Sequence, residues 1–300
     1  MLLIVSNSMD GTTDLLLPLL QGKKEVFRFN VDIWSKYEIK VNHSDFTIVD
    51  PIGRRITQDT CSGMYLRKPY FLDEDRHKPP GGDLESWCQY QIRSIIDGLY
   101  WICSQRGLVR LVERNAERRL PKVAQMRLAE SFFHVPRWTV ATNPMSCNLG
   151  ESVICKPLAS AYLGEYQTLF TTKCSVGELD FGYPWLIQDY IDADGDLTIV
   201  YAIGRLFSFF RRKIDGEPVD FKQVEHGQDK GWSLIEVPCD LEYSIKEFMG
   251  QLNLEFGRLD FLVKDDKFYF LEINCNGQFA WLDPENSLGL LGWIADCISV

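Results

Sequence analysis

GRLDFLVKDDKFYFLEIN, residues 257–274, is typical of two antiparallel strands joined by a tight turn at 264–267. Asp260 lies on the first strand, and Glu272 and Asn274 lie two apart on the second, so these two share one strand face. Pairing around the turn brings Asp260 close to Glu272 across the ladder. Three oxygen ligands on one sheet face suit Mg²⁺, which takes its other ligands from water and phosphates. Acidic residues on an exposed, solvated strand would explain the same spacing equally well.

Two lysines upstream of this hairpin are candidate phosphate contacts. Lys122 opens a predicted helix over 120–133, with Pro121 at its start, and Lys156 ends an apolar strand predicted over 152–158. A lysine at the end of a buried strand can reach into a cleft and bind phosphate. A lysine that keeps its ammonium group in water while its stem packs on apolar surface has the same pattern.

A third candidate segment is QDYI, residues 188–191, which follows an apolar strand and precedes the acidic turn DADGD. Backbone groups at such a strand end can pair with the edge of an adenine ring. An ordinary strand followed by a turn is the alternative.

The remaining pattern alternates short apolar runs with helical periodicity, which favours an α/β (α+β) class. Predicted strands cover 1–6, 26–32, 46–50, 63–69, 185–191, 197–204 and 205–212, and predicted helices cover 84–105 and 241–252. The Pro- and Gly-rich stretch 73–83 is a predicted loop. We divide the chain into an N-terminal α/β domain (1–115), a central domain (116–190) and a C-terminal domain (191–300).

Composition excludes several classes of protein. The 300 residues carry a formal net charge of −10 with a pI near 5.0, which argues against a nucleic-acid binder. Nine cysteines, an odd number without C-x-x-C spacing, disfavour a zinc cluster and favour a reduced, cytoplasmic location. The start MLLIVS reads as a strand rather than a signal peptide, and no run approaches the roughly 18 apolar residues that span a membrane.

The order of these pieces resembles the ATP-grasp superfamily over the whole chain. The lysine pair, the Q-x-Y-I segment and the closing D…E-x-N carry that resemblance. FLEINCNGQFAWLD (270–283) is similar to the E-I-N-x-N-G-Q-aromatic signature of graspetide macrocyclases, the microviridin-type ligases. MYLRKP (64–69) resembles their W-x-R-R-P segment, with Lys68 in place of the second arginine, and residues 115–139 fit the same group.

The resemblance implies an ATP-grasp fold, with ATP and two Mg²⁺ ions as cofactors. In this comparison Lys122 and Lys156 bind the phosphates, and Asp260, Glu272 and Asn274 hold the metal. Gln188, Tyr190 and Ile191 frame the adenine, and Asp196 contacts the ribose. Two cations, Arg211 and Lys222, neutralise the acylphosphate. The sequence departs from the family at Thr198 and Lys222, where arginine is common, and at Cys275, where proline is common.

The implied activity is ATP-dependent formation of amide or ester cross-links in a ribosomal precursor peptide. One alternative is an ATP-grasp ligase that adds amino acids to a protein tail or a small molecule, and another is a non-catalytic nucleotide-binding module. The expected partners are the precursor peptide and a second copy of this chain. The leader is expected to dock at 211–227, where Arg211 and Lys222 should affect chemistry, and Lys213 and Glu217 peptide affinity only.

Overall fold

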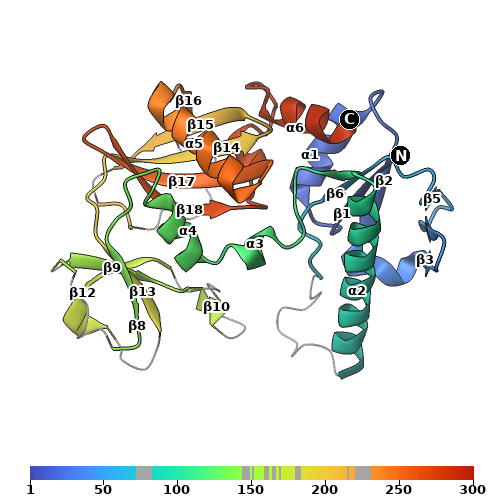
Figure 1. Ribbon diagram of the computed structural model, residues 1–300, viewed down its shortest axis with the longest axis horizontal. Helices are drawn as coiled ribbons and strands as arrows, with labels where there is room; N and C mark the ends of the chain where they lie inside the picture. Colours follow the sequence, from blue (N-terminus) through green and yellow to red (C-terminus); the bar gives the residue numbers. More distant parts are fainter. Residues whose placement is uncertain are drawn as a thin grey trace.

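The computed structural model describes residues 1–71, 83–143, 149–150, 152–158, 162–163, 167–168, 170–179, 184–214, 216–219 and 231–300. Its helices are α1 (Gly11–Leu20), α2 (Asp83–Gln105), α3 (Ala116–Arg119), α4 (Lys122–Ala129), α5 (Cys239–Leu252) and α6 (Leu290–Ser299), with 3₁₀ turns η1 (Val31–Lys36), η3 (Val176–Glu178) and η5 (Ala280–Leu282). Figure 1 shows their arrangement around the sheets. Among the described residues, no helix combines the length and the apolar character needed to cross a membrane.

The N-terminal sheet is parallel and has the strand order β2-β1-β6-β7. Its strands are β1 (Leu2–Ser6), β2 (Val26–Asn30), β6 (Gly63–Leu66) and β7 (Val109–Arg110). Every residue of β1 is buried because a central parallel strand is covered on both faces. Helix α2 covers one face through Ile92, Ile96 and Leu99. A small antiparallel sheet, β3 (Glu38–Val41), β4 (Phe46–Val49) and β5 (Arg55–Thr57), extends this core.

The central sheet is antiparallel, with the order β12-β9-β13-β8. It is formed by β8 (Trp138–Ala141), β9 (Ser152–Lys156), β12 (Thr172–Ser175) and β13 (Trp185–Asp189), with a small separate pair β10 (Tyr162–Leu163) and β11 (Gln167–Thr168). Val153 and Ile187 form its buried centre. Lys156 is the last residue of β9, so the central sheet fixes the position of its backbone.

The C-terminal sheet is antiparallel and has the order β16-β15-β14-β17-β18. Its strands are β14 (Gly195–Ala202), β15 (Arg205–Arg212), β16 (Ser233–Ile235), β17 (Phe256–Lys264) and β18 (Lys267–Asn274). Leu197, Ile199 and Leu259 are in one buried cluster with residues of α4 and α5. Because side chains alternate along a strand, Asp196, Thr198 and Asp260 point to the other face.

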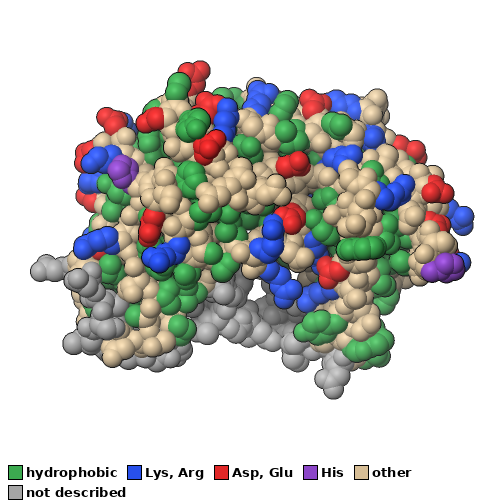
Figure 2. All heavy atoms as spheres, in the orientation of Figure 1, with side chains coloured by type: hydrophobic (Ala, Val, Ile, Leu, Met, Phe, Trp, Pro, Cys, Tyr) green, Lys and Arg blue, Asp and Glu red, His purple; other side chains and the backbone are tan. Residues whose placement is uncertain are grey.

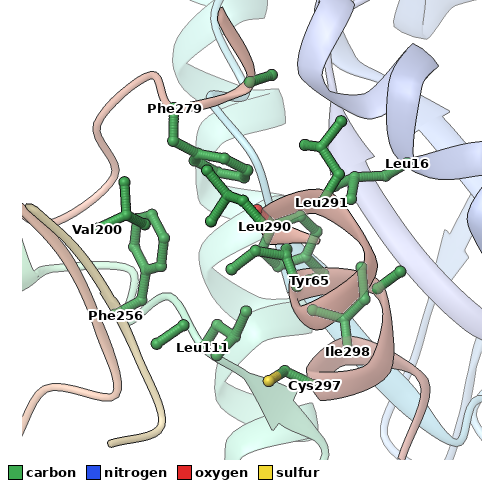
Figure 3. Packing of buried hydrophobic residues seen from close by; sticks show 14 of the residues in the cluster. Leu16, Tyr65, Leu111, Val200, Phe256, Phe279, Leu290, Leu291, Cys297 and Ile298 are labelled. Carbon is green, nitrogen blue, oxygen red and sulfur yellow. The ribbon is translucent and has the colours of Figure 1, made fainter. Parts of the chain in front are cut away.

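The C-terminal helix α6 links the first and last sheets. Leu290, Leu291 and Ile298 of α6 share a buried cluster with Leu16 of α1 and with Val200 and Phe256 of the C-terminal sheet (Figure 3). Val200 lies on the same face of β14 as Asp196 and Thr198, further along the strand. The apolar half of this face is therefore sealed by α6, and its polar half stays available for a site.

The predicted α/β class is confirmed, and the closing hairpin has the predicted turn, with Lys264 paired to Lys267. Asp265 and Asp266 make this turn with positive φ, which Asp tolerates better than most residues. The predicted helix 120–133 is shorter than expected: α4 spans Lys122–Ala129 after the separate turn α3. Helix α6 was not predicted. The division into three domains stays a prediction.

Candidate active site

The three predicted metal ligands lie together on the β17–β18 hairpin. Asp260 is paired directly with Glu272 in the ladder, and a β-bulge follows between Asp260 and Phe261. The Asn274 amide nitrogen donates to Asp260 Oδ2 at 3.3 Å and to Glu272 Oε1 at 3.2 Å. The amide N–H group therefore lies between two carboxylates, in the position that suits a cation.

Cationic and hydroxyl groups surround this carboxylate pair. Lys122 Nζ is 3.7 Å from Glu272 Oε2, so the first lysine approaches the metal ligands and is bonded to the carbonyl of Pro157 as well. Arg258 donates to both oxygens of Asp260, at 3.2 and 2.9 Å. Thr198 donates its hydroxyl to Asp260 Oδ1 at 2.9 Å. The threonine that departs from the family pattern thus holds the carboxylate of Asp260, a predicted metal ligand.

Sequence reasoning missed Arg258 and the role of Thr198. Arg258 is two residues before Asp260, so strand alternation alone puts both on one face. The nearby carboxylates Asp260 and Glu272 raise the pKa of Arg258, although burial by itself lowers it. A guanidinium that stays charged beside two carboxylates limits their mutual repulsion while no metal is bound.

A cleft opens beside the hairpin, between the central and C-terminal sheets. Its empty space is about 1100 Å³ when the open mouth is included. Predicted site residues that line it are Lys122, Lys156, Tyr190, Ile191, Asp196, Asp260 and Glu272. Most of the residues singled out in the sequence therefore meet around one cavity, although they come from four separate parts of the chain.

Gln188 does not line this cleft. Its side chain is fully buried, with Nε2 3.4 Å from the sulfur of Met126 in α4. Its buried Oε1 has no hydrogen-bond partner among the described residues. Tyr190 lies beyond the end of β13, so the strand alternation that would pair it with Gln188 no longer applies. Two neighbours in sequence thus differ: Tyr190 faces the cleft, and Gln188 is buried behind it.

Arg211 is held by two carboxylates. It donates to Asp196 Oδ2 at 2.8 Å and to Glu217 Oε2 at 2.9 Å. Burial raises the pKa of Asp196 in spite of the opposing effect of Arg211. Glu217 is thus ion-paired with Arg211, and the expectation that it acts on peptide affinity alone stays a prediction. Lys213 lines the cleft, and Lys222 lies outside the described residues.

The two signature segments contact each other across the molecule. Arg67, at the end of β6, is fully buried and donates to Asn276 Oδ1 at 2.6 Å and Gln278 Oε1 at 2.5 Å. Its guanidinium lies 5.2 Å from the centre of the Phe279 ring. Cys275 beside them is buried, and burial raises the pKa of its thiol to about 12, which makes it a packing residue rather than a nucleophile.

The site fits the implied cofactors. Two carboxylates and an amide within hydrogen-bonding distance provide oxygen ligands for Mg²⁺, once the Asn274 amide turns its oxygen inward. No cluster of three or more His, Cys, Asp or Glu suited to a metal occurs within the described ranges, so this smaller set is the candidate. The cleft beside it has Lys122 and Lys156 for phosphates and the strand end at Tyr190 and Ile191 for a base.

No protein-family model and no curated protein matches this chain. Solved structures do match over nearly the whole length. The macrocyclase MdnC from Microcystis aeruginosa MRC, bound with its precursor peptide MdnA, has a TM-score of 0.83 and 19% identity, covering 99% of this chain and 98% of MdnC. A Chryseobacterium gregarium RiPP-associated ATP-grasp ligase, in complex with ADP and a leader and core peptide, has a TM-score of 0.77 and 21% identity. The match covers 99% of this chain and 96% of that ligase.

The ATP-grasp ligase PsnB, complexed with a phosphomimetic variant of its minimal precursor, Mg and ADP, has a TM-score of 0.80 and 15% identity, covering 99% of this chain and 97% of PsnB. These neighbours agree with the resemblance that the signature segments carry. Matches of this length confirm the fold expected from the sequence: the chain has the ATP-grasp fold.

Proposed function

We propose that this chain is an ATP-dependent ligase that activates a side-chain carboxylate of a ribosomal precursor peptide and forms amide or ester cross-links. The observation that carries the proposal is the meeting of Asp260, Glu272 and Asn274 with Lys122 beside one cleft. The peptide-bound complexes of structurally similar ligases support a peptide as the substrate.

Each part of the site has a task in this proposal. Asp260, Glu272 and Asn274 hold Mg²⁺, which we propose as two ions. ATP supplies the phosphoryl group that turns a carboxylate into an acylphosphate, with ADP as the leaving group. Lys122 and Lys156 bind the phosphates and offset charge that builds up during transfer. Tyr190 and Ile191 border the base, and Asp196 is the proposed ribose contact.

Two of the proposed roles need a change of partners. Arg211 can neutralise the acylphosphate only if it exchanges Glu217 for the substrate, because both of its observed partners are carboxylates. Lys222 keeps its proposed role in neutralising the acylphosphate, and Gln188 its proposed role near the adenine. For Gln188 the buried oxygen without a partner supports a hydrogen bond from a ligand that reaches behind the strand end.

The leader peptide is proposed to dock on the segment 211–227, of which residues 211–214 and 216–219 are described. Arg212 and Ile214 are exposed there, and Ile214 is 69% exposed. An exposed apolar side chain beside cations suits a leader that has both apolar and acidic residues. Since Glu217 is committed to Arg211, the test of docking uses Arg212→Ala and Ile214→Ala, with labelled leader peptide and ATP affinity as the control.

Self-association is the second proposed interaction. Helix α2 exposes Trp87 and Trp101, which are seven residues on either side of the exposed Ser94. Two antiparallel copies of this helix would place each Trp87 against the other copy's Trp101 around a twofold axis at Ser94. Sedimentation of wild type and Trp87→Ala tests this homodimer. The cytoplasmic location expected from the sequence remains part of the proposal.

The deciding experiment is ATP turnover in the presence of precursor peptides encoded beside the gene. Peptide-dependent ADP formation, with loss of one water mass per cross-link, is the expected result. Turnover with free amino acids or a protein tail instead would favour the alternative ligase. ATP binding without turnover on any acceptor would favour the non-catalytic nucleotide-binding module.

A further inference from the structure

The N-terminal sheet contains a topological switch point. The chain leaves β1 for β2 on one side through α1, and later returns to β6 on the other side of β1. At such a point the carboxyl ends of neighbouring parallel strands open a crevice where ligands bind. Asn7 follows β1, and Arg67 and Lys68 follow β6. The Asn7 side chain donates to the carbonyl of Lys68 at 2.9 Å, so the two strand ends are tied together.

This crevice is connected to the metal-binding hairpin through Gln278. Arg67 Nη2 donates to the side-chain oxygen of Gln278 at 2.5 Å, and Arg258 Nη1 donates to its main-chain carbonyl at 2.8 Å. Arg258 in turn holds Asp260. Gln278 thus links the end of β6, which bears Arg67 and Lys68, to Arg258, which contacts the proposed metal ligand Asp260.

Both arginines are committed to protein partners, whereas Lys68 is not. Arg67 is bonded to Asn276, Gln278 and Thr12. For Lys68 Nζ the described part of the chain has no hydrogen bond and no ion pair, although the residue is half-buried. A long side chain that could extend into water is instead kept near two other cations.

The backbone at Lys68 is strained. Its φ is 46°, in the left-handed region that residues with a Cβ rarely adopt. Two hydrogen bonds to its carbonyl hold it there, from Asn7 and from the Tyr70 amide at 2.7 Å. Strain of this kind occurs where a side chain must be aimed.

We propose that Lys68 binds the carboxylate that the ligase activates, so that the acyl donor lies between the β1–β6 switch point and the Asp260 hairpin. This inference rests on the proposed function and names where its acyl donor binds. The half-buried ammonium group of Lys68 lies near Arg67 and Arg258, so the ligand that suits it is an oxyanion. Burial, then Arg67 and Arg258, lower the pKa of Lys68 to about 8, which agrees with a cation awaiting an anion. Figure 2 shows Lys and Arg side chains at the rim of the hollow between the two halves of this face.

The test observes Lys68 directly. Lysines are converted to ¹³C-dimethyl-lysine, which keeps the charge, and their NMR signals are recorded in protein loaded with ADP and Mg²⁺. The probe is N-acetylglutamic acid α-amide, with one side-chain carboxylate, and its matched control is N-acetylglutamine α-amide. The Lys68 signal is assigned by its absence in Lys68→Arg, and exposed Lys40 serves as the internal control.

We expect the Lys68 signal to shift with the carboxylate probe and not with the amide, while the Lys40 signal stays. Lys68→Met should lower the affinity for the carboxylate probe roughly tenfold to hundredfold, as loss of a charge-assisted contact does. Lys68→Arg should keep part of that affinity. ADP affinity should be equal in all variants.

Three outcomes would overturn the inference. An unmoved Lys68 signal, or equal probe affinity in wild type and Lys68→Met, removes Lys68 from the carboxylate site while the proposed function stands if ADP still binds. A response to inorganic phosphate alone would assign Lys68 to the transferred phosphoryl group instead. If ADP and Mg²⁺ fail to bind wild type, the proposed function falls, and this inference falls with it.

Discussion

Arg67 Nη1 lies 2.6 Å from Asn276 Oδ1, although the two residues are 209 positions apart in the chain. The first belongs to the parallel sheet that opens the fold, and the second follows the strand that carries Glu272 and Asn274. The contact fixes the end of the β17–β18 hairpin, which bears the proposed metal ligands, against the N-terminal sheet. The two segments that resemble graspetide ligases are thus two sides of one buried polar network.

Arg67→Met should therefore destabilise the protein strongly. The guanidinium is fully buried, and its removal takes a charged donor away from Asn276 and Gln278 and the nearby cation away from Asp10. Breaking a buried charged network of this kind costs about 3–5 kcal/mol of unfolding free energy. Arg67→Lys should also destabilise, because an ammonium cannot make the forked contacts.

Denaturant unfolding measures this loss, with exposed Arg55→Met as the matched control, expected to stay within about 0.5 kcal/mol of wild type. An Arg67→Met protein as stable as the control would mean that the network contributes specificity without stability.

The sequence could predict the hairpin because its signals are local. Strand alternation and a tight turn set the pairing of Asp260 with Glu272, and both are visible in eighteen consecutive residues. Sequence reasoning could not predict that Arg67 contacts Asn276, because no local pattern encodes a contact between distant segments. Helix α6 was also missed, although the buried residues of its short run LLGWIADCIS, such as Leu290, Ile294 and Ile298, recur at helical spacing. The different surroundings of Gln188 and Tyr190 could not be predicted either, because Tyr190 lies beyond the end of β13, where strand alternation stops.

Asp260→Asn and Glu272→Gln should abolish the dependence of nucleotide affinity on Mg²⁺. Each change removes one negative ligand while it keeps the size of the side chain. Alanine would be a poorer choice at Asp260, because it would leave the largely buried Arg258 without its carboxylate partner.

Calorimetric titration of ADP with and without Mg²⁺ measures this effect. Asp266→Asn is the matched control, since Asp266 lies in the exposed turn of the same hairpin and asparagine tolerates its positive φ. If Glu272→Gln kept the full enhancement by Mg²⁺, the metal site would have to lie elsewhere.

Lys156→Ala should weaken ATP binding about tenfold to hundredfold, which corresponds to the roughly 1.5–3 kcal/mol of a charge-assisted contact. Lys156 is buried at the end of β9 and lines the cleft. Exposed Lys40→Ala controls for the loss of one positive charge. Unchanged ATP affinity in Lys156→Ala would return this lysine to the structural role that its sequence context also allows.

Lys68→Met should raise the thermal stability of the protein at neutral pH, and this advantage should fade at high pH. The pKa of Lys68 is lowered from 10.5 to about 8, first by burial and then by Arg67, with Arg258 acting in the same direction and Glu117 and Asp10 against it. Because the folded state binds this proton more weakly than the unfolded state, charged Lys68 is a cost to folding. That cost is fully present below about pH 8 and is relieved as the pH rises toward 10.5.

The measurement is the difference in unfolding temperature between wild type and Lys68→Met across this range, which cancels the titration of groups common to both. Lys40→Met should show no such trend, because Lys40 is exposed. A Lys68→Met advantage that stayed constant from neutral pH to pH 10.5 would show that it arises from packing rather than from the buried charge. The expected trend, together with weaker carboxylate binding in the same variant, would mean that Lys68 lowers stability in order to hold a cation where the acyl donor needs one.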